Sequence, residues 1–406
     1  MQKVTITQIN GSEKRFSELK AMFGEHFGTI PSRCFSAPGR SEICGNHTDH
    51  NHGKVLAAAV DLDVIAAVEP TDDGFVTVKS EGYPEDKIAL SDLSVVDDEK
   101  NTSAALIRGV LAGFKARGHA IGGFKAYTRS NVLKGSGLSS SAAFEVLIGT
   151  ILSGLYNGGN VSAVEIAQIA QYAENVYFGK PSGLMDQMAS SVGGFTKIDF
   201  ADPEKPVIEA ISLDLAAHGH RLCIIDTRGN HADLTPDYAA IPAEMKAAAG
   251  ELGKSHLREL SRDDILNNIA ALREKTGDRA VLRALHFMDE NERVDELAEA
   301  IRHDDFTAFL SVINRSGDSS YKYLQNVFAS SHPNEQGVSL ALYIASSILG
   351  KAGACRVHGG GFAGTIQAFV PDDLLDTFVS GMETVFGAGS CYVLSVRPYG
   401  GVEVAL

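Results

Sequence analysis

The densest group of potentially reactive side chains in this sequence lies at 39–54, in the stretch GRSEICGNHTDHNHGK. It places His47, His50 and His52 beside Asp49, a set that could ligate a metal ion or hydrogen-bond a ligand rich in hydroxyl groups. Zinc-binding histidines are commonly spaced HxxxH on a helix. Here the histidines occur among Asn and Gly without a helical pattern, so the spacing favours hydrogen bonds to hydroxyl groups.

A second stretch, KGSGLSSSA at 134–142, could bind phosphate. Gly135 and Gly137 permit positive φ and close backbone approach, and the serines at 139–141 stand where a long apolar helix is predicted to begin. The first N–H groups of a helix lack partners within it and can bind an anion. The alternative is a flexible turn before a well-capped helix. The stretch matches neither the Walker loop nor the Rossmann glycine pattern, so we interpret it as a phosphate site of another type.

Two acids could assist such a site. Glu174 lies in sequence predicted to be helical, where an acid is usually an ordinary surface residue. Asp186 lies in SGLMDQ between apolar residues and a glycine, so it is either a solvated turn residue or part of a site. Mg²⁺ takes oxygen ligands, typically one or two side chains together with phosphates and water. Residue types alone leave both readings of each acid open.

The elements that must position these residues are short strands and amphipathic helices. We predict helices at 12–28, 101–117, 141–157 and 163–178, mostly helical sequence at 240–350, and strands at 54–70, 74–82, 122–133, 220–229 and on both sides of the glycine turn in 355–371. The stretch at 134–141, here called the serine turn, is therefore predicted to join a strand to a helix. A link near 201–206 that contains Pro and Asp precedes a new alternating run, which predicts a domain boundary there.

Length and composition restrict the class of protein. The 406 residues, 44% of them hydrophobic and 21% charged, are typical of a globular chain with more than one core. The formal charge of −15 argues against a nucleic-acid or membrane partner but leaves a small phosphate ligand open. Without an apolar leader, a run of 18 apolar residues or a CxxC pair among the five cysteines, the sequence predicts a cytoplasmic protein with reduced thiols.

Four stretches together resemble the galactokinase family of the GHMP small-molecule kinases. APGRSEICGNHTDHNHG resembles the first family motif, usually GRVNLIGEHTDYNxG, and GSGLSSSAA resembles the second. AENVYFGKPSGLMDQMAS is similar to the family's AENxFxGVxCGIMDQ, and CRVHGGGFAGTIQAFV is similar to its third glycine motif. The matches keep the family's order and extend over residues 37–370, so they cover nearly the whole chain.

The resemblance implies an α+β fold of two lobes with the active site in the cleft between them. The first would be an S5-like GHMP kinase domain at 1–203, rejoined by the last strand at about 391–406. The second would be an α/β-sandwich, ferredoxin-like domain at 204–390. The implied activity is an ATP- and Mg²⁺-dependent sugar 1-kinase that converts galactose to galactose 1-phosphate. The partners are then a sugar and ATP, and the oligomeric state is left open.

The resemblance also implies roles for individual residues. Asp186 would accept the proton of the anomeric hydroxyl group, Arg40 would orient Asp186 and stabilise the transition state, and Ser141 and Glu174 would hold Mg²⁺. The sugar would contact Asn46, His47, Thr48, Asp49, Gly183 and Tyr238, and ATP would contact Ser80, Gly135, Ser136, Gly137, Leu138, Ser139, Ser140 and Ser141. His50 and His52 would point away from the sugar, and Tyr238 is otherwise an ordinary half-buried loop tyrosine.

The chain departs from the family pattern within the first motif, residues 37–53, here called the sugar motif. Glu42 stands where the family usually has Asn, and Asn46 stands where it usually has the Glu that contacts the C6 arm of galactose. A neutral Asn46 would also tolerate a charged C6 group. A kinase for a C6-modified sugar such as galacturonate is therefore an alternative. A non-catalytic galactokinase-like sensor and a kinase for a non-sugar alcohol are further ones, but the retained Arg40, Ser141, Glu174 and Asp186 favour a sugar kinase.

Overall fold

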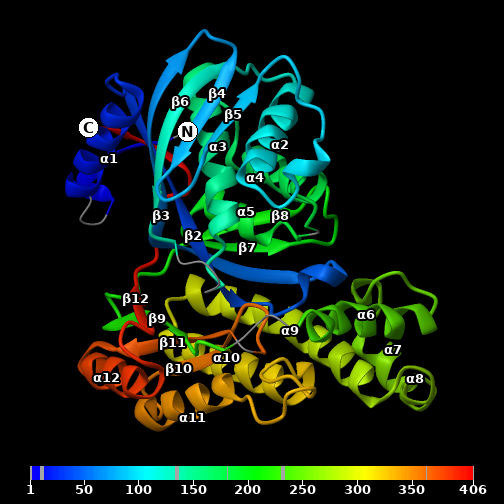
Figure 1. The fold of residues 1–406 in the computed structure, drawn as a ribbon. Helices are drawn as coiled ribbons and strands as arrows, with labels where there is room; N and C mark the ends of the chain where they lie inside the picture. The colour runs from blue at the N-terminus through cyan, green and yellow to red at the C-terminus, as the bar shows by residue number, and fades with distance from the viewer. Residues whose placement is uncertain are drawn as a thin grey trace.

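The fold is taken from a computed structural model, which describes residues 2–9, 13–132, 137–180, 182–229, 234–362 and 364–405. The chain forms two lobes, one above the other in Figure 1, each built around a β-sheet with helices packed on it. The first and last strands pair in parallel within the upper lobe. The second lobe is therefore flanked in sequence by two parts of the first.

The sheet of the first lobe has nine strands among the described residues. Its main path is β1–β13–β2–β3–β6–β4–β5, while β7 pairs with the first part of β3 and β8 pairs with β7. The strands are β1 (Lys3–Thr5), β2 (Arg33–Cys44), β3 (Lys54–Thr71), β4 (Phe75–Ser80), β5 (Glu85–Ala89), β6 (Gly123–Ser130), β7 (Phe195–Asp199), β8 (Val207–Ile211) and β13 (Val402–Ala405).

Both faces of this sheet are covered by helices. Along β3, Ile65 and Ala67 pack with α1 in one apolar cluster, whereas their neighbours Val64 and Ala66 belong to the main core, as expected from the alternation of side chains along a strand. The helices of this lobe are α1 (Glu13–Phe27), α2 (Ser103–Ala116), α3 (Ser140–Tyr156), α4 (Ala163–Tyr172) and α5 (Met185–Val192). Helices α3 and α5 contact β2 and β3, which brings both helix starts close to the middle of the sheet.

The second lobe contains an antiparallel sheet of four strands among the described residues, in the order β10–β11–β9–β12. These strands are β9 (His220–Asp226), β10 (Ala354–His358), β11 (Thr365–Pro371) and β12 (Cys391–Leu394). One face packs on α11 and α12, and the other continues the main core with α10. The helices are α6 (Thr235–Glu251), α7 (Arg262–Asn267), α8 (Ile269–Thr276), α9 (Asp278–Arg302), α10 (Phe306–Ser319), α11 (Gly337–Leu349) and α12 (Leu375–Phe386).

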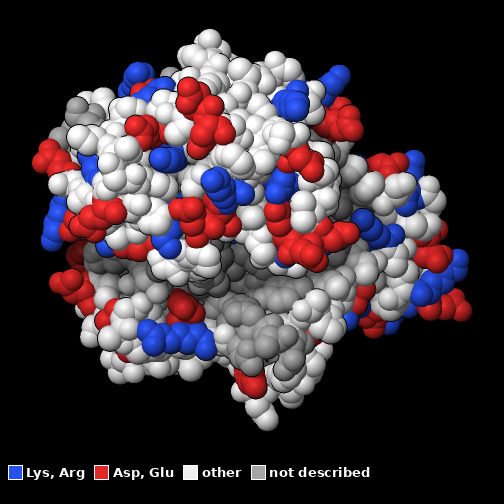
Figure 2. Space-filling view, turned by 45° about the horizontal axis from the view of Figure 1, so that its top comes forward, with Lys and Arg blue, Asp and Glu red and all other residues white. Residues whose placement is uncertain are grey.

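Strand β2 connects the two lobes. It begins in the first sheet and ends between the lobes, where the turn that follows it lies beside α6 and α9 (Figure 1). Eleven of its twelve residues are buried, because it is covered on both sides. A space-filling view shows the molecule hollowed between the lobes, with acidic and basic side chains mixed over the surface around the hollow (Figure 2). No helix of the described chain is long and apolar enough to cross a membrane.

The structure corrects two parts of the sequence-based organisation. The run expected to return to the first lobe at 391–406 divides, because β12 pairs with β9 in the second sheet and only β13 pairs with β2. The first sheet also continues to Ile211, beyond residue 203, because β8 pairs with β7. The division into domains at 1–203 and 204–390 stays a prediction. Strand β2 was not expected, since its Pro, Gly and charged residues hide the alternation.

A buried ion pair fastens the last part of the chain to the first sheet, and its loss should be costly. Asp63 on β3 is fully buried and accepts from Arg397 at 3.1 Å, Ser36 at 2.6 Å and Arg15 at 2.8 Å. We expect Asp63→Ala to lower the free energy of unfolding by about 3–5 kcal/mol, because it leaves the buried Arg397 without its carboxylate. Urea denaturation measures this change. Asp318→Ala, which removes an exposed partner of Lys322, should leave the midpoint unchanged, and equal effects would contradict the expectation.

Candidate active site

Arg40 reaches the site because β2 is irregular at this point. The pairing of β2 with β3 shifts register between Pro38 and Arg40, and such bulges redirect side chains. Gly39 allows a close approach to the serine turn, since a Cβ there would lie 2.9 Å from the carbonyl oxygen of Leu138. The backbone N–H of Arg40 donates to the same oxygen at 3.1 Å. Strand and turn are thus joined, and the guanidinium lies next to the start of α3.

Asp186, in the first turn of α5, receives hydrogen bonds from two other segments. The Nε and Nη2 atoms of Arg40 lie 2.7 Å and 2.6 Å from Oδ1, and the hydroxyl group of Ser139 donates to Oδ2. Arg40 also donates to the carbonyl oxygen of Gly137. The Arg40 side chain is 8% exposed and that of Asp186 is 25% exposed. The carboxylate therefore remains open to a ligand, with the arginine buried behind it.

The charge on Asp186 is fixed by these neighbours. Burial raises the pKa of Asp186, but the charge of Arg40 and the hydrogen bonds from Ser139 and Arg40 lower it by more, so the pKa lies below its ordinary 3.8. Nearby, burial and the charges of Arg40 and Arg356 hold the pKa of His358 well below its usual value. At neutral pH the site therefore contains an ionised acid, a permanent cation and a neutral imidazole, which allows Asp186 to accept a proton.

Ser141 and Glu174, the two predicted metal ligands, lie side by side. The Ser141 hydroxyl group, one residue into α3, donates to Glu174 at 3.1 Å. Glu174 lies in a short π-helical segment, η4 (Ala173–Phe178), that continues α4, and such segments are frequent at functional sites. Lys180 and Ser182 also donate to this carboxylate, at 3.0 Å and 2.8 Å.

This pair fits Mg²⁺ in its chemistry. Both residues offer oxygen, which Mg²⁺ prefers, and the ion usually takes only one or two protein ligands when it also binds phosphates. The fully buried Glu174 carboxylate already attracts the ammonium group of the exposed Lys180, which shows that a cation is favoured beside it. In the described part of the chain, no cluster of three or more His, Cys, Asp or Glu side chains is arranged to hold a metal ion.

A supporting layer behind Glu174 was not found from the sequence. Gln187, the neighbour of Asp186, donates to Glu174 at 2.7 Å and to the fully buried Glu145 at 3.2 Å. Burial, and then the charge of Glu174, raises the pKa of Glu145 well above its usual value. Gln187 could have been found from the sequence, because it belongs to the DQ dipeptide at 186–187 within a family motif. Glu145 could not, because a buried glutamate in the apolar helix α3 has no local sequence pattern that marks it.

His47 and Asp49 lie in the turn that follows β2, near the segment of Asp186. The Nε2 atom of His47 donates to the carbonyl oxygen of Gly360 at 3.1 Å, and burial, followed by the charge of His50, lowers the pKa of His47 to about 4. Asp49 packs on Gly183, where any Cβ would collide with its carboxylate. The structure therefore brings together His47, Asp49 and Gly183, as expected for contacts to one small ligand.

Asn46 is placed differently from these residues. It is fully buried, and its amide donates to Glu42 at 2.9 Å and to the carbonyl oxygen of Gly359 at 2.8 Å. Its carbonyl oxygen accepts from Asn326 at 2.8 Å and from Ser320 at 3.2 Å. These bonds fill the hydrogen-bonding positions of a carboxamide, so in this arrangement Asn46 fastens the sugar motif to the second lobe. Its predicted contact with a sugar stays a prediction.

The remaining residues predicted to contact a sugar are Thr48 and Tyr238. Thr48 is fully buried and lies 2.8 Å and 2.6 Å from the carbonyl oxygens of Gly45 and Lys54, so its hydroxyl group closes the turn. Tyr238 lies on α6, donates to the carbonyl oxygen of Gly361 at 3.0 Å, and packs so closely on Gly360 that a Cβ there would be 2.7 Å from its ring. Tyr238 therefore covers the same glycine turn that His47 and Asn46 contact.

The other predicted nucleotide contacts lie along one edge of the first sheet. Ser80 ends β4 and accepts from Thr128 at 2.8 Å, and the parallel strands β4 and β6 end at the edge from which the serine turn departs. Leu138 is fully buried, so only its backbone is available. Ser140 begins α3 next to Ser141. Gly135 and Ser136, also predicted to bind ATP, lie outside the described residues.

Comparison with known sequences identifies relatives along most of the chain. A family model described as the galactokinase galactose-binding signature matches residues 21–70, and one for the GHMP kinase N-terminal domain matches residues 105–194. The chain is 32% identical over 368 residues to a galactokinase of Streptomyces coelicolor, covering 90% of this chain and 92% of the relative. It is also 32% identical to a galactokinase of Mycobacterium tuberculosis, covering 84% of this chain and 89% of the relative.

Solved structures give the same picture for the fold. A Lactococcus lactis galactokinase complexed with galactose superposes with a TM-score of 0.80 at 25% identity, covering 97% of this chain and all of the other. A mevalonate kinase superposes with a TM-score of 0.64 over 90% of this chain and 99% of the other at 13% identity, which supports the fold alone. The expected α+β GHMP kinase fold is thereby confirmed.

The pH dependence of this site should change when Arg40 is replaced. In Arg40→Gln the burial that raises the pKa of Asp186 is no longer offset by the arginine, so the pKa should rise above 3.8. Because Asp186 is predicted to act as the base in its ionised form, we expect activity to fall at a higher pH as the solution becomes more acidic. We expect turnover to drop about 10²–10³-fold, and an acid limb to appear in the residual kcat/KM profile.

The control for this change is Arg129→Gln, which removes a partly exposed arginine paired with Glu18 and Glu81. It should leave the profile of kcat/KM against pH as it is in the unmodified protein. An acid limb at the same pH in all three proteins would contradict the link between Arg40 and the pKa of Asp186.

Proposed function

This chain belongs to the galactokinase family of the GHMP kinases, and we propose that it transfers the γ-phosphoryl group of ATP to the anomeric hydroxyl group of galactose. The enzyme is a phosphotransferase with an alcohol group as acceptor. The observation that most supports the proposed roles is the meeting of Arg40, Ser139 and Asp186 at the start of α3. Three segments distant in sequence thus converge on one partly open carboxylate.

In the proposed reaction, the anomeric oxygen forms a bond to the γ-phosphorus while the bond from that phosphorus to the bridging oxygen of ADP breaks. The hydroxyl proton passes to Asp186. A carboxylate with a lowered pKa is a weak base, so the proton leaves late, as the loose transition state develops. Arg40 keeps Asp186 ionised and oriented, and its fixed charge stabilises the charge that moves from the γ-phosphate.

The binding of ATP is proposed to depend on the start of α3. The first N–H groups of a helix are free to bind phosphate oxygens and carry the positive end of the helix dipole. Ser141 and Glu174 would hold Mg²⁺, which when bound neutralises charge on the phosphates. The side chain of Gln187 donates a hydrogen bond to the Glu174 carboxylate at 2.7 Å. Because Gln187 follows Asp186 on α5, the same helix positions both the proposed base and a proposed metal ligand.

For the acceptor, we propose that His47, Asp49 and Gly183 make the direct contacts with the sugar. His47 is neutral, and Asp49 offers two acceptor oxygens, a combination suited to hydroxyl groups. Tyr238 closes this side by packing on the glycine turn. Asn46 and Thr48 are proposed to act through the turn that they hold, because their polar groups are used within the protein.

Replacing the base tests both the activity and the assignment of Asp186. We expect Asp186→Asn to lower kcat by about 10²–10⁴-fold, because an amide cannot accept the proton, while galactose binding persists in calorimetry. ADP release is measured with galactose, galacturonate, N-acetylgalactosamine and homoserine, and galactose should give the highest kcat/KM. Asp376→Asn, at an exposed position of α12, is the matched control and should keep full activity.

Two results would contradict this proposal. Binding of galactose without ADP release on any acceptor would indicate a sensor, and a higher kcat/KM for galacturonate would indicate the kinase for a C6-modified sugar. Full activity of Asp186→Asn would leave the kinase intact but remove the proposed base.

A further inference from the structure

Strand β12 is an edge of the second sheet, and two of its residues turn their backbone groups away from the sheet. The N–H of Asp226 donates to the carbonyl oxygen of Ser390, just before β12, at 2.8 Å. In an antiparallel pair, such hydrogen-bonded residues alternate with residues whose N–H and C=O groups point away from the neighbouring strand. Cys391 and Val393 occupy these alternate positions. Within the described chain, their outward backbone groups form no backbone hydrogen bond.

At other places the edges of this sheet have partners. On the opposite edge, the N–H of Cys355 on β10 donates to the side chain of Asn314 on α10 at 3.1 Å. Just after β12, the N–H of Asp61 on β3 donates to the carbonyl oxygen of Ser395 at 3.0 Å. An unpaired stretch of edge strand can accept another extended chain. The two outward residues of β12 are therefore an open place for an added strand.

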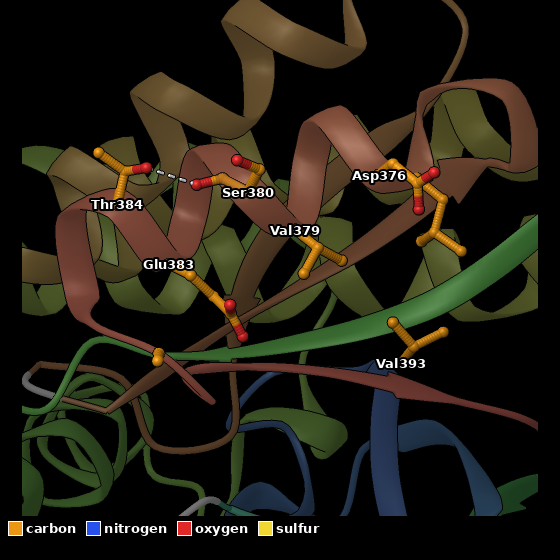
Figure 3. Close-up of a pocket in the computed structure, with 8 residues that line it drawn as sticks. Asp376, Val379, Ser380, Glu383, Thr384 and Val393 are labelled. Carbon is orange, nitrogen blue, oxygen red and sulfur yellow. Dashed lines mark hydrogen bonds between the residues drawn. The ribbon is translucent and has the colours of Figure 1, made fainter.

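A groove of about 500 Å³ lies beside this open edge, between β12 and α12 (Figure 3). Val379 points from the helix toward the strand, Val393 points from the strand toward the helix, and Leu375 adds apolar surface. Residues that lie opposite each other in an antiparallel pair have their side chains on the same face. An antiparallel strand added at the edge would therefore direct every second side chain into the groove.

The groove carries negative charge. Asp376 and Glu383 belong to its lining, which includes no described Lys, Arg or His. They are seven residues apart on α12, which is two turns or about 10 Å, and Val379 lies between them in sequence. Neither acid forms an ion pair with a described residue. The neighbouring Arg228 instead donates to the carbonyl oxygen of Ala388 at 2.7 Å.

We propose that this groove binds an extended basic segment of a partner protein, which adds to β12 as an antiparallel fifth strand of the sheet. The backbone groups of Cys391 and Val393 pair with the segment, and an aliphatic side chain lies against Val379. Lys or Arg side chains two residues to either side face Asp376 and Glu383. Such side chains are about 13 Å apart along a strand, close to the separation of the acids. Main-chain hydrogen bonds supply affinity and the groove supplies selectivity.

A second copy of this chain is the other occupant that could pair with the open edge. It would bring the same two acids to the joined sheet, on a chain with a formal charge of −15. Juxtaposed like charges disfavour such a pair, whereas a basic segment complements the groove. None of the lining residues is among those proposed to bind ATP or the sugar, so the occupant and the phosphoryl transfer can be tested separately.

Fluorescence anisotropy with the full chain tests the proposal, with the capped and labelled peptide Lys-Thr-Val-Thr-Lys as the probe. We expect saturable binding. Replacing both lysines by glutamates, or N-methylating the valine so that it cannot donate to β12, should each weaken binding by about tenfold or more. No binding of the parent peptide would overturn the proposal. Equal binding of the N-methylated peptide would show attraction by charge alone and would contradict the added strand.

Variants of the groove locate the binding. Val393→Pro removes an outward N–H without removing a hydrogen bond to β9, a placement that edge strands tolerate, and should weaken peptide binding by about tenfold. Asp376→Asn combined with Glu383→Gln should weaken it by about as much, and this variant leaves the backbone intact. Galactose phosphorylation should be unchanged in both.

The control combines Asp373→Asn with Glu335→Gln, two exposed acids outside the lining, and should bind the peptide as the unmodified protein does. Unchanged binding in both groove variants would exclude the groove as the site. Sedimentation of the free chain as a dimer that Val393→Pro dissociates would assign the edge to a second copy and would also overturn the proposal.

Discussion

The arrangement depends on one largely desolvated ion pair, Arg40 with Asp186. The charged Arg40 side chain, 8% exposed, requires an opposite charge and further acceptors, or its burial would cost several kcal/mol. Asp186 provides the charge, and the carbonyl oxygen of Gly137 provides another acceptor. These partners lie on α5 and on the turn before α3, so β2, the serine turn and α5 must meet at one point. Gly39 and the bulge in β2 allow β2 to approach the serine turn closely. The start of α3 then lies beside Arg40 and Asp186.

A second constraint holds the sugar motif in place from below. Glu290 on α9 is fully buried and accepts from Arg293 at 2.6 Å and from the backbone N–H of Gly45 at 3.0 Å. His286, on the same helix, lies 3.0 Å from the carbonyl oxygen of Asn46. The motif is therefore continuous with a strand of the first lobe but is bonded to a helix of the second. The turn is held in a fixed position because both lobes contribute hydrogen bonds to it.

The sequence was sufficient for the parts of this architecture that leave a local pattern. The helices at α1 to α4 and strands β3, β4 and β6 follow the expected periodicity, and the motifs located Arg40, Asp186, Ser141 and Glu174. What could not be predicted depends on partners far along the chain. Glu145 and Gln187 act beneath Glu174 only because α3 and α5 pack together, and Asn46 finds Asn326 only across the lobes. The division of the last segment between two sheets likewise depends on which strand each part pairs with, and both parts have the same strand-like pattern.

The two departures from the family's sugar motif are one structural change. Glu42 and Asn46 are bonded to each other at 2.9 Å, so exchanging carboxylate and carboxamide between the two positions retains a charged hydrogen bond of the same kind. The carboxylate now lies at 42, where Arg356, itself fully buried, donates to it at 3.0 Å. Burial raises the pKa of Glu42, and the charge of Arg356 opposes that rise. The exchange therefore moves a negative charge away from the turn and toward the second sheet. None of the hydrogen bonds on Asp186 involves either residue, so the motif can differ here while those hydrogen bonds stay as they are.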